Sequence, residues 1–432
     1  MLRAAMVGFF AVLIAMPVAA QAPAQAAQEI TLDEAVRRSL DVQPAMVQAR
    51  GDQRNAGASM RTAFGSFLPT LTTGASAARS NVGRIDVTTG QPVPPDYSYT
   101  GTLNASLELF DGFRRFANLK AANATGDAAA AGIVNQRFQV TLATKQTFYA
   151  AIANEELVRV AQSQLDRAKQ QLQISIDKLH AGSATRSDSL RSTVDYGNAR
   201  IALLQAQANL ATAQANLGRQ IGVDALVRAV PDTTLPAVPD TAGIRNMALG
   251  AAPAVAQAQA QASAARAQVW SVRSQYWPSL TVSYSNNRQG TASPSFPLFG
   301  NYPETFSWRF GLSWTLFNGF IREANQTSAS VNRDLAEARA ADTRRQVNAL
   351  VTQQLAALST AVEQINIARD NLAAATEDLR VQNERYRVGA ATILDLLTSQ
   401  AALTQAQVNV VQTRFNYLIA RAQVEAVVGR TL

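Results

Sequence analysis

The chain has 432 residues, and its 39 lysines and arginines outnumber its 31 aspartates and glutamates, giving a formal net charge of +8. Only 16% of the residues are charged and the cations form no long run, which argues against nucleic-acid binding. Cysteine is absent, so disulfides, thiolate metal sites and an acylated N-terminal cysteine are excluded. His180 is the one histidine, and neither a phosphate loop nor a nucleophile turn occurs, so we expect no enzyme, cofactor or metal site.

Residues 1–26 have the features of a secretory signal peptide. Arg3 precedes an apolar run over residues 4–16, and small residues offer cleavage sites after positions 20 to 26. The run is shorter than the roughly 20 residues that a membrane-spanning helix needs, and no later segment is longer. We therefore expect an exported protein whose membrane attachment, if it has one, comes from strands.

The mature chain repeats itself. Leu-Phe-Asp-Gly-Phe at 109–113 returns as Leu-Phe-Asn-Gly-Phe at 316–320, and Asp188 returns as Asp395, in each case 207 residues later. Such a duplication indicates two copies of one structural unit rather than two or three unrelated domains. The expected organisation is a first repeat over 27–217, a connector over 218–250 and a second repeat over 251–432.

Each copy contains strand segments that alternate between apolar and polar side chains. The alternation is clearest over 97–109 and 306–316, and a weaker segment precedes each, so we expect β-hairpins over 68–110 and 279–317. A bilayer-spanning strand needs about 9 to 11 residues in this pattern, with aromatic side chains near the interfaces. The candidate aromatic membrane belt consists of Tyr97, Tyr99, Tyr284, Phe306, Trp308 and Trp314.

Four strands cannot close a membrane barrel within one chain. In lipid every backbone donor and acceptor must be paired, so an open four-stranded sheet cannot span a bilayer alone. Small closed barrels begin at about eight strands. The pattern therefore predicts an oligomer and leaves open a dimer, a trimer or a larger ring. The alternative is a soluble, half-buried sheet, which explains the alternation without requiring lipid.

Very long helices follow each hairpin. No proline occurs between Gly112 and Pro231, and none occurs after Gly319. One helix over 112–178 would reach roughly 100 Å. The expected N-caps are Asp111 and Asn318. The expected turns are at Gly182 and Gly389, and the expected return helices span 185–217 and 392–428.

Each return helix carries two apolar seams that are offset by two residues. In the second copy one seam includes Leu394 and Phe415, and the other includes Leu396 and Tyr417. Two residues along a helix are about 200° apart, so this helix should have neighbours on nearly opposite sides. Helices of this kind form walls that can close into a tube, whereas a compact bundle buries one broad face. The first copy repeats the seams with Leu190, Val194, Ile201 and Leu204 on one and Leu203, Ala206, Leu210 and Leu217 on the other.

The strand exits, the duplicated turns and Tyr386-Arg387-Val388-Gly389 followed by Ile393-Leu394-Asp395 resemble, in order and spacing, the TolC family of outer-membrane factors. The resemblance covers the whole mature chain. It implies a mixed α/β membrane protein in which each subunit contributes two β-hairpins and two long coiled-coil hairpins. Three subunits would form a twelve-stranded β-barrel continuous with a twelve-helix α-barrel.

The resemblance also implies a function. The homotrimer would lie in the outer membrane of a Gram-negative bacterium, surrounded by lipid, with most of the chain in the periplasm. It would passively conduct substrates from an inner-membrane pump or ABC exporter through a periplasmic adaptor, for small-molecule efflux or type I protein secretion. The alternative is an exported structural coiled coil without channel activity.

In this family the helical tips form a constricted entrance, which the resemblance places at matching residues here. The candidate entrance residues are Asp188, Asp395, Arg186, Tyr386 and Thr398. Thr398 and Ala391 stand where the family can have an acid and an arginine. We therefore expect the closed entrance to be held more weakly, by Arg186 paired with Asp188 or Asp395 and hydrogen-bonded to Tyr386. A solvated acid in the first turn of a helix would explain either aspartate alone. The candidate adaptor-docking residues are Ala181, Gly182, Ser183, Ala184, Val388, Gly389, Ala390, Ala391 and Thr392.

Overall fold

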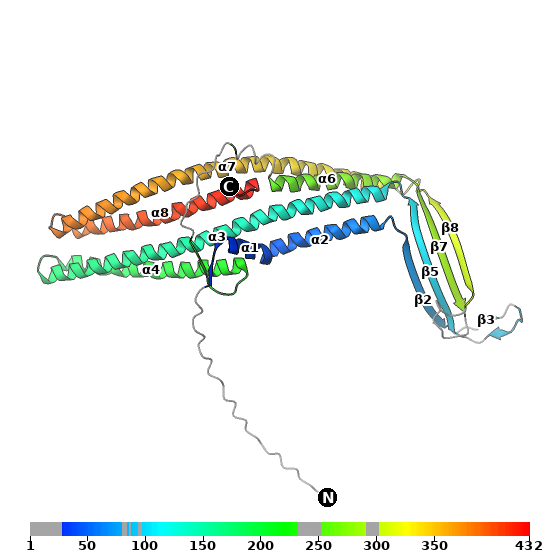
Figure 1. Cartoon of the computed structure of the whole chain (residues 1–432), viewed down its shortest axis with the longest axis horizontal. Helices are drawn as coiled ribbons and strands as arrows, with labels where there is room; N and C mark the ends of the chain where they lie inside the picture. Colours follow the sequence, from blue (N-terminus) through cyan, green and yellow to red (C-terminus); the bar gives the residue numbers. More distant parts are fainter. Residues whose placement is uncertain are drawn as a thin grey trace, which may run out of the picture.

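The computed structural model describes residues 28–79, 84–85, 88–93, 97–231, 243, 252–290 and 302–432. The predicted signal peptide lies outside the described residues, as does most of the predicted connector. A four-stranded sheet lies at one end of the molecule, and long helices extend away from it toward two helical turns at the far end (Figure 1).

Two pairs of helices repeat with the predicted spacing. α3 (Arg114–His180) and α7 (Ile321–Arg387) have 67 residues each, and α4 (Arg186–Ile221) and α8 (Ile393–Val428) have 36 residues each. The corresponding ends are 207 positions apart, like the repeated motifs. At 1.5 Å per residue, α3 and α7 are each roughly 100 Å long. None of the helices in the described part of the chain is long and apolar enough to cross a membrane.

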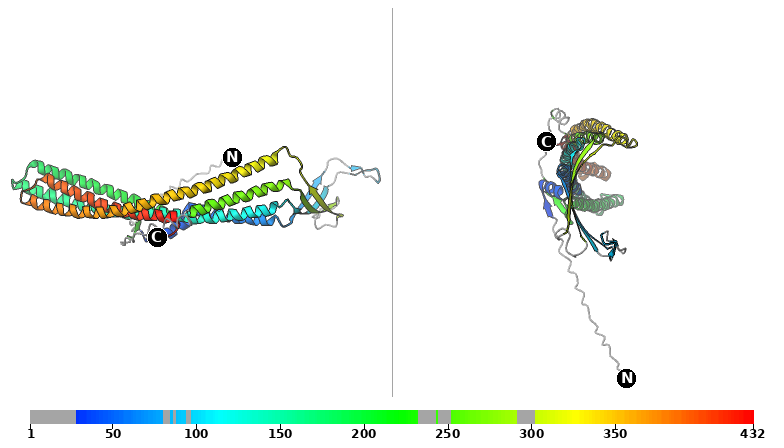
Figure 2. Two further views of the ribbon diagram at one scale, coloured as in Figure 1. Left: turned by 90° about the horizontal axis from the view of Figure 1, so that it is seen from above. Right: turned by 90° about the vertical axis from the view of Figure 1, so that its right-hand side faces the viewer.

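Shorter helices pack beside α3 and α7 in the half of the molecule that is next to the sheet. α1 (Leu32–Val42) and α2 (Pro44–Gly65) precede the first hairpin, and α6 (Pro253–Arg273) with a 3₁₀ turn (Ser274–Tyr276) precedes the second. α2 and α6 pack on α3, and α6 also packs on α7; in the other half α4 and α8 pack on α3, and α8 packs on α7. Viewed along the long axis, the helices form an open arc (Figure 2).

The sheet is antiparallel and has two open edges. Its strands are β2 (Thr70–Arg79), β5 (Tyr97–Phe110), β7 (Ser279–Gly290) and β8 (Glu304–Ser313), in the order β2-β5-β7-β8. β2 and β8 each have one hydrogen-bonded neighbour in this sheet, so their outer backbone groups are available to another chain.

The last predicted strand is shorter than expected. β8 ends at Ser313, so Trp314 and the residues to 316 lie beyond it. The chain turns there because the indole of Trp314 donates to the carbonyl of Tyr276 at 3.2 Å, while the carbonyls of Thr315 and Leu316 accept hydrogen bonds from Arg322.

Five of the six predicted belt residues share one face of the sheet. Tyr97, Tyr99, Tyr284, Phe306 and Trp308 have the same register parity, and the rings of Tyr284 and Trp308 are 4.9 Å apart.

Two pairs of short strands lie outside the four-stranded sheet. β1 (Gln28–Ile30) pairs in parallel with β6 (Val227–Ala229) beside the helices, and β3 (Arg84–Ile85) pairs with β4 (Pro92–Val93). α4 continues to Ile221, four residues past the predicted limit of the first return helix. The Gly222 that follows has a φ of 75°, which ends the helix in the left-handed conformation that glycine adopts readily.

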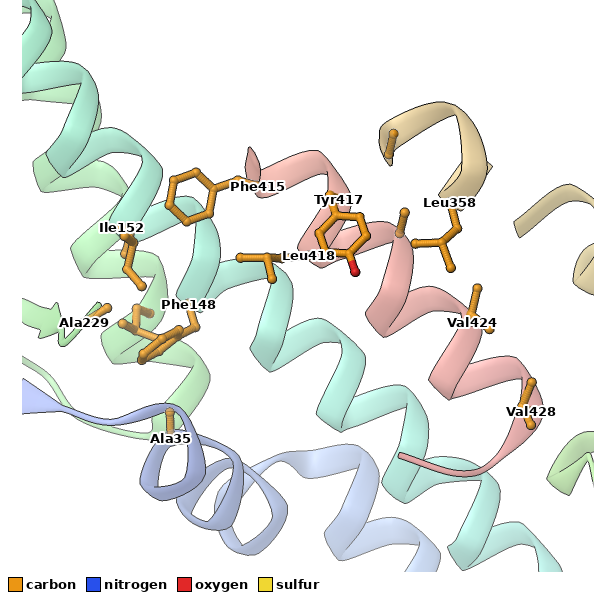
Figure 3. Packing of buried hydrophobic residues seen from close by; sticks show 14 of the residues in the cluster. Ala35, Phe148, Ile152, Ala229, Leu358, Phe415, Tyr417, Leu418, Val424 and Val428 are labelled. Carbon is orange, nitrogen blue, oxygen red and sulfur yellow. The ribbon is translucent and has the colours of Figure 1, made fainter. Parts of the chain in front are cut away.

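The main hydrophobic core lies at mid-length, where α3, α7 and α8 meet (Figure 3). Phe148 of α3 and Leu358 of α7 are fully buried there, and Phe415 and Leu418 of α8 pack in the same cluster. A second, smaller cluster around Leu396 joins α7 and α8 closer to the tips. The two predicted seams of α8 therefore both have neighbours.

The return helix of the first copy has a neighbour for only one seam in the single chain. Leu203 and Leu217 of α4 are buried, but the side chains of the other seam are more than half exposed. These exposed residues are Leu190, Val194, Ile201 and Leu204. The expectation of two neighbours is thus met by α8, while the second face of α4 is unpartnered within the described chain.

Candidate functional site at the helical tips

Both hairpin turns have the same backbone design. α3 and α7 end at residues 180 and 387, and Gly182 and Gly389 follow with φ of 72° and 79°. The amide of Ser183 donates to the carbonyl of Lys178 at 2.8 Å, and the equivalent amide of Ala390 donates to Arg385 at 2.7 Å. Glycine permits the positive φ that each turn requires. All nine candidate docking residues lie in these two turns, between the helices that the turns connect.

The two candidate aspartates form matching capping boxes at the starts of α4 and α8. The Asp188 carboxylate accepts from the amide of Thr185 at 3.0 Å and from its hydroxyl at 2.7 Å, and the Thr185 hydroxyl accepts from the Asp188 amide. Asp395 and Thr392 repeat this pattern at 2.9 and 2.8 Å. The motif satisfies amide groups that lack partners at a helix start.

These hydrogen bonds lower the pKa of both carboxyl groups. The Thr185 hydroxyl has the largest effect on the pKa of Asp188, and the Thr392 backbone amide has the largest effect on the pKa of Asp395. The Asp395 residue is exposed and Asp188 is half-buried. Each tip therefore presents an ionised, fixed carboxylate at neutral pH.

Lys178 makes the contact at the second tip that was predicted for Arg186. Its Nζ lies 3.7 Å from the centroid of the Tyr386 ring and donates to the Tyr386 carbonyl at 2.9 Å. Within the described chain, Arg186 forms no ion pair with Asp188 or Asp395, and the Tyr386 hydroxyl has no hydrogen-bond partner. The Thr398 hydroxyl donates to Leu394 in its own helix at 2.8 Å. Within one chain, Lys178 therefore joins the two hairpins, and the expected Arg186 contacts stay a prediction for the assembled ring.

The strand-to-helix corners contain a second duplicated arrangement. The predicted N-caps, Asp111 and Asn318, lie two residues before the observed cap positions, Phe113 and Phe320, because the chain takes positive φ at two successive residues in each corner. The two predicted side chains still accept from helix amides. The Asp111 carboxylate accepts from the backbone amide of Arg115 at 3.0 Å, and the side-chain oxygen of Asn318 accepts from the backbone amide of Arg322 at 3.4 Å.

Arg115 and Arg322 fix these corners, and the sequence interpretation missed both. Arg115 donates to the carbonyl of Leu109 at 3.1 Å, and its Nε is 3.2 Å from the Asp111 carboxylate. Arg322 donates to two carbonyls beyond β8, at 2.7 and 2.9 Å. Both side chains are largely buried, over the rings of Phe67 and Tyr276 respectively. The 207-residue offset between the two arginines was the available signal.

No metal site accompanies this geometry: in the described ranges, no group of three or more His, Cys, Asp or Glu side chains is arranged to hold an ion.

A duplicated β-hairpin with open sheet edges, joined to long hairpins of helices, defines an outer-membrane channel subunit. The chain belongs to the outer membrane efflux protein family, whose model matches residues 35–223 and 244–430. The resemblance drawn from the sequence is thereby confirmed.

Two relatives are distant in sequence but match most of the chain. The outer membrane efflux protein BepC of Brucella suis is 25% identical, over 82% of this chain and 78% of BepC. The pyoverdine export outer membrane protein OpmQ of Pseudomonas aeruginosa is 27% identical, over 90% of this chain and 83% of OpmQ. The solved structure of the outer membrane protein VceC from Vibrio cholerae has a TM-score of 0.78 at 18% identity, covering 92% of this chain and 96% of VceC, which establishes a shared fold.

Proposed function

We propose that the chain is the outer-membrane exit duct of a tripartite export system, conducting substrates passively from an inner-membrane pump through a periplasmic adaptor. The observation that carries this proposal is the continuity of an open-edged sheet with helices of 67 residues in a single curved wall. A wall of this kind can enclose a path when copies close around it. A structural coiled coil would have no use for the apolar face of the sheet.

A homotrimer completes the wall. The open edges of β2 and β8 would pair between copies, so three copies would give a closed barrel of twelve strands. The exposed seam of α4, which includes Ile201 at 66% exposure, would pack on α7 of the next copy, where Ile367 is 51% exposed. The helices would then form the twelve-helix tube.

The sheet would lie in the outer membrane of a Gram-negative bacterium and the helices in the periplasm. The large apolar side chains on one face of β8 support this placement, since Phe306, Trp308, Phe310 and Leu312 are each more than 60% exposed. Export would follow from the predicted signal peptide.

The helical tips would form the entrance. In a trimer Asp188 and Asp395 would give two sets of three carboxylates, and a focused acidic ring attracts cations. The contact of Lys178 with Tyr386 would hold the two hairpins of each subunit together in the closed state. The adaptor would dock on the two exposed turns, which include Val388 at 70% exposure.

Small molecules are the favoured substrate class. This preference rests on two relatives: BepC is named an efflux protein and OpmQ a pyoverdine export protein.

A planar-bilayer recording tests the proposal. The detergent-extracted protein should have the mass of a trimer in detergent and should give small currents that multivalent cations block. A water-soluble species without conductance would refute the duct and support the structural coiled coil.

A further inference from the structure

The four-stranded sheet has a polar face opposite its apolar face. Glu108 of β5 lies opposite Thr281 of β7 on this polar face. Ser283 of β7 lies opposite Arg309 of β8, also on the polar face, because alternate residues of β8 lie on opposite sides and Trp308 is on the apolar side. In the proposed barrel the apolar face meets lipid, so the polar face lines the lumen. The charges on it therefore border the path of the substrate.

The polar face continues from the sheet onto the helices. A pocket at the strand-to-helix corner is lined by Glu108 and Ser279 of the polar face and by Gln275 of the 3₁₀ turn. Gln275 also lines a groove between α6 and α7 together with Gln268, and Gln261 lines two grooves farther along α6. These three glutamines recur every seventh residue, so they share one side of the helix. Uncharged amides thus extend the polar face along α6.

Two charged side chains occupy the polar face in the described strands. Glu108 is held by Arg114 of α3, whose guanidinium donates to its two carboxylate oxygens at 3.1 and 2.9 Å. Arg309 is exposed and forms no ion pair or hydrogen bond within the described chain. The other paired positions on this face are serine, threonine, asparagine, glutamine, glycine or alanine. Arg309 is therefore the unpaired charge on the polar face of the described sheet.

Closure of the barrel would not give Arg309 a carboxylate partner on a neighbouring strand. β8 is an edge strand, and in the proposed trimer it would pair with β2 of the next copy. The polar-face residues of β2 lack carboxylates, so no register of that pairing places one beside Arg309; they are Thr70, Thr72, Gly74, Ser76 and Ala78. On its other side, Glu108 is two strands away, or about 10 Å across the sheet, and is paired with Arg114.

We propose, on the basis of the proposed trimeric duct, that three Arg309 side chains form a cationic ring in the barrel lumen that binds an oxyanion group of the substrate. Twelve strands about 4.8 Å apart and tilted by about 40° give a barrel with a backbone radius of about 12 Å. Arginine side chains extend inward from this radius, so the three charges would lie within about one Debye length, roughly 8 Å, of the axis. A bound anion would relieve their mutual repulsion, and rings of arginine select anions in pores for this reason.

The surroundings of Arg309 suit an oxyanion. Ser283 lies directly opposite on β7, and Ser307 precedes Arg309 on the same face of β8, so hydroxyl donors flank the guanidinium. Gly311, the next residue on this face, has no side chain and leaves room beside the guanidinium. A guanidinium binds carboxylates and phosphates through two parallel hydrogen bonds. The acidic tips lie roughly 100 Å away along the helices, far beyond the Debye length, so they do not cancel this charge.

Block of single channels by inorganic tripolyphosphate tests the ring. The full-length protein would be inserted into planar phosphatidylcholine bilayers, and tripolyphosphate would be added to both sides. We expect block of the wild type and at least about tenfold weaker block of Arg309→Gln, because one hydrogen bond to a charged group corresponds to about tenfold in affinity. Arg309→Lys keeps the charge but loses the parallel bonds, so its block should weaken by less than about fivefold.

Two further variants distinguish the ring from a general effect of charge. Arg273→Gln removes the same charge from α6, but Arg273 is two residues from Gln275 and so lies on nearly the opposite side of the helix; block should be unchanged. Glu108→Gln leaves Arg114 without its carboxylate beside the lumen, so block should become stronger. The mass of each variant in detergent would be checked for a trimer.

Two results would overturn the inference. One is a conducting wild-type channel that tripolyphosphate does not block, and the other is equal block of the wild type and Arg309→Gln. If Arg309→Gln failed to assemble, block of Glu108→Gln that is no stronger than that of the wild type would overturn it. A wild-type chain that neither forms a trimer nor conducts would instead refute the proposed duct, so the two failures are distinguishable.

Discussion

Replacing Lys178 by methionine should open the entrance. Methionine retains an unbranched stem of similar length but removes the ammonium group, and with it both contacts to Tyr386. The two residues are 208 positions apart and belong to different hairpins, so their separation is coupled to the spacing of the tips. A state with separated tips would lack both contacts.

The structure sets the size of the effect. An exposed cation–π contact contributes about 0.5 to 1 kcal/mol, and a hydrogen bond from a charged donor contributes about 1.5 kcal/mol at the low end that suits a half-buried site. The sum of about 2 to 2.5 kcal/mol corresponds to a shift of about thirtyfold to seventyfold toward the open state in each subunit. Tyr386→Phe keeps the ring and the carbonyl, so it should shift this ratio by less than about twofold.

Open probability in planar bilayers, recorded for Lys178→Met, Tyr386→Phe and Tyr386→Leu, tests this assignment. Lys169→Met is the matched control, because Lys169 lies nine residues earlier on α3 and therefore on its opposite face. Wild-type gating in Lys178→Met would refute the proposal that the contacts of Lys178 with Tyr386 hold the tips closed. An equally large effect of Tyr386→Phe would instead identify the tyrosine hydroxyl as the group that holds the tips.

Three further predictions concern charge, pH and the core. Asp395→Asn should weaken block by multivalent cations severalfold in single-channel recordings, whereas Thr392→Ala, which removes the hydroxyl that bonds Asp395 but keeps the charge, should leave block unchanged. Hydrogen bonds lower the pKa of the Asp188 carboxyl in the folded state, so its capping interaction stabilises α4 above about pH 4 and is lost as pH falls through the lower folded pKa. The protection of the first amides of α4 from hydrogen exchange should therefore be constant from about pH 8 to 5 and should decrease below about pH 4. Phe148→Ala should destabilise the protein by about 3 to 5 kcal/mol in denaturant titrations followed by circular dichroism, and Phe148→Leu by clearly less.

The long helices could be predicted from the sequence because local signals determine them. Proline is absent over each long segment, and a glycine that can take positive φ follows each helix end. The predicted 112–178 and the observed Arg114–His180 have the same length and differ by two residues. The shift arises because Gly112 and Phe113 both have positive φ, so the helix cannot begin until both have been passed.

The contacts at the site were harder to predict because they join distant segments. Tyr386 contacts Lys178 through its ring and its backbone carbonyl, and neither interaction leaves a local sequence pattern. Arg186 was a reasonable choice of cation by position alone, but it belongs to the first turn of α4, whereas Lys178 lies on α3 and faces the other hairpin. Arg115 and Arg322 could have been found by extending the repeated motif by two residues.

The open edges of the sheet have a genetic consequence. If the barrel closes only when every β2 edge meets a β8 edge, one subunit with a blocked edge disables the whole ring. Co-expression of such a subunit with the wild type at equal levels would leave about one ring in eight intact in a homotrimer. Loss-of-function alleles in β2 or β8 should therefore be dominant, whereas alleles that prevent folding of the chain altogether should be recessive.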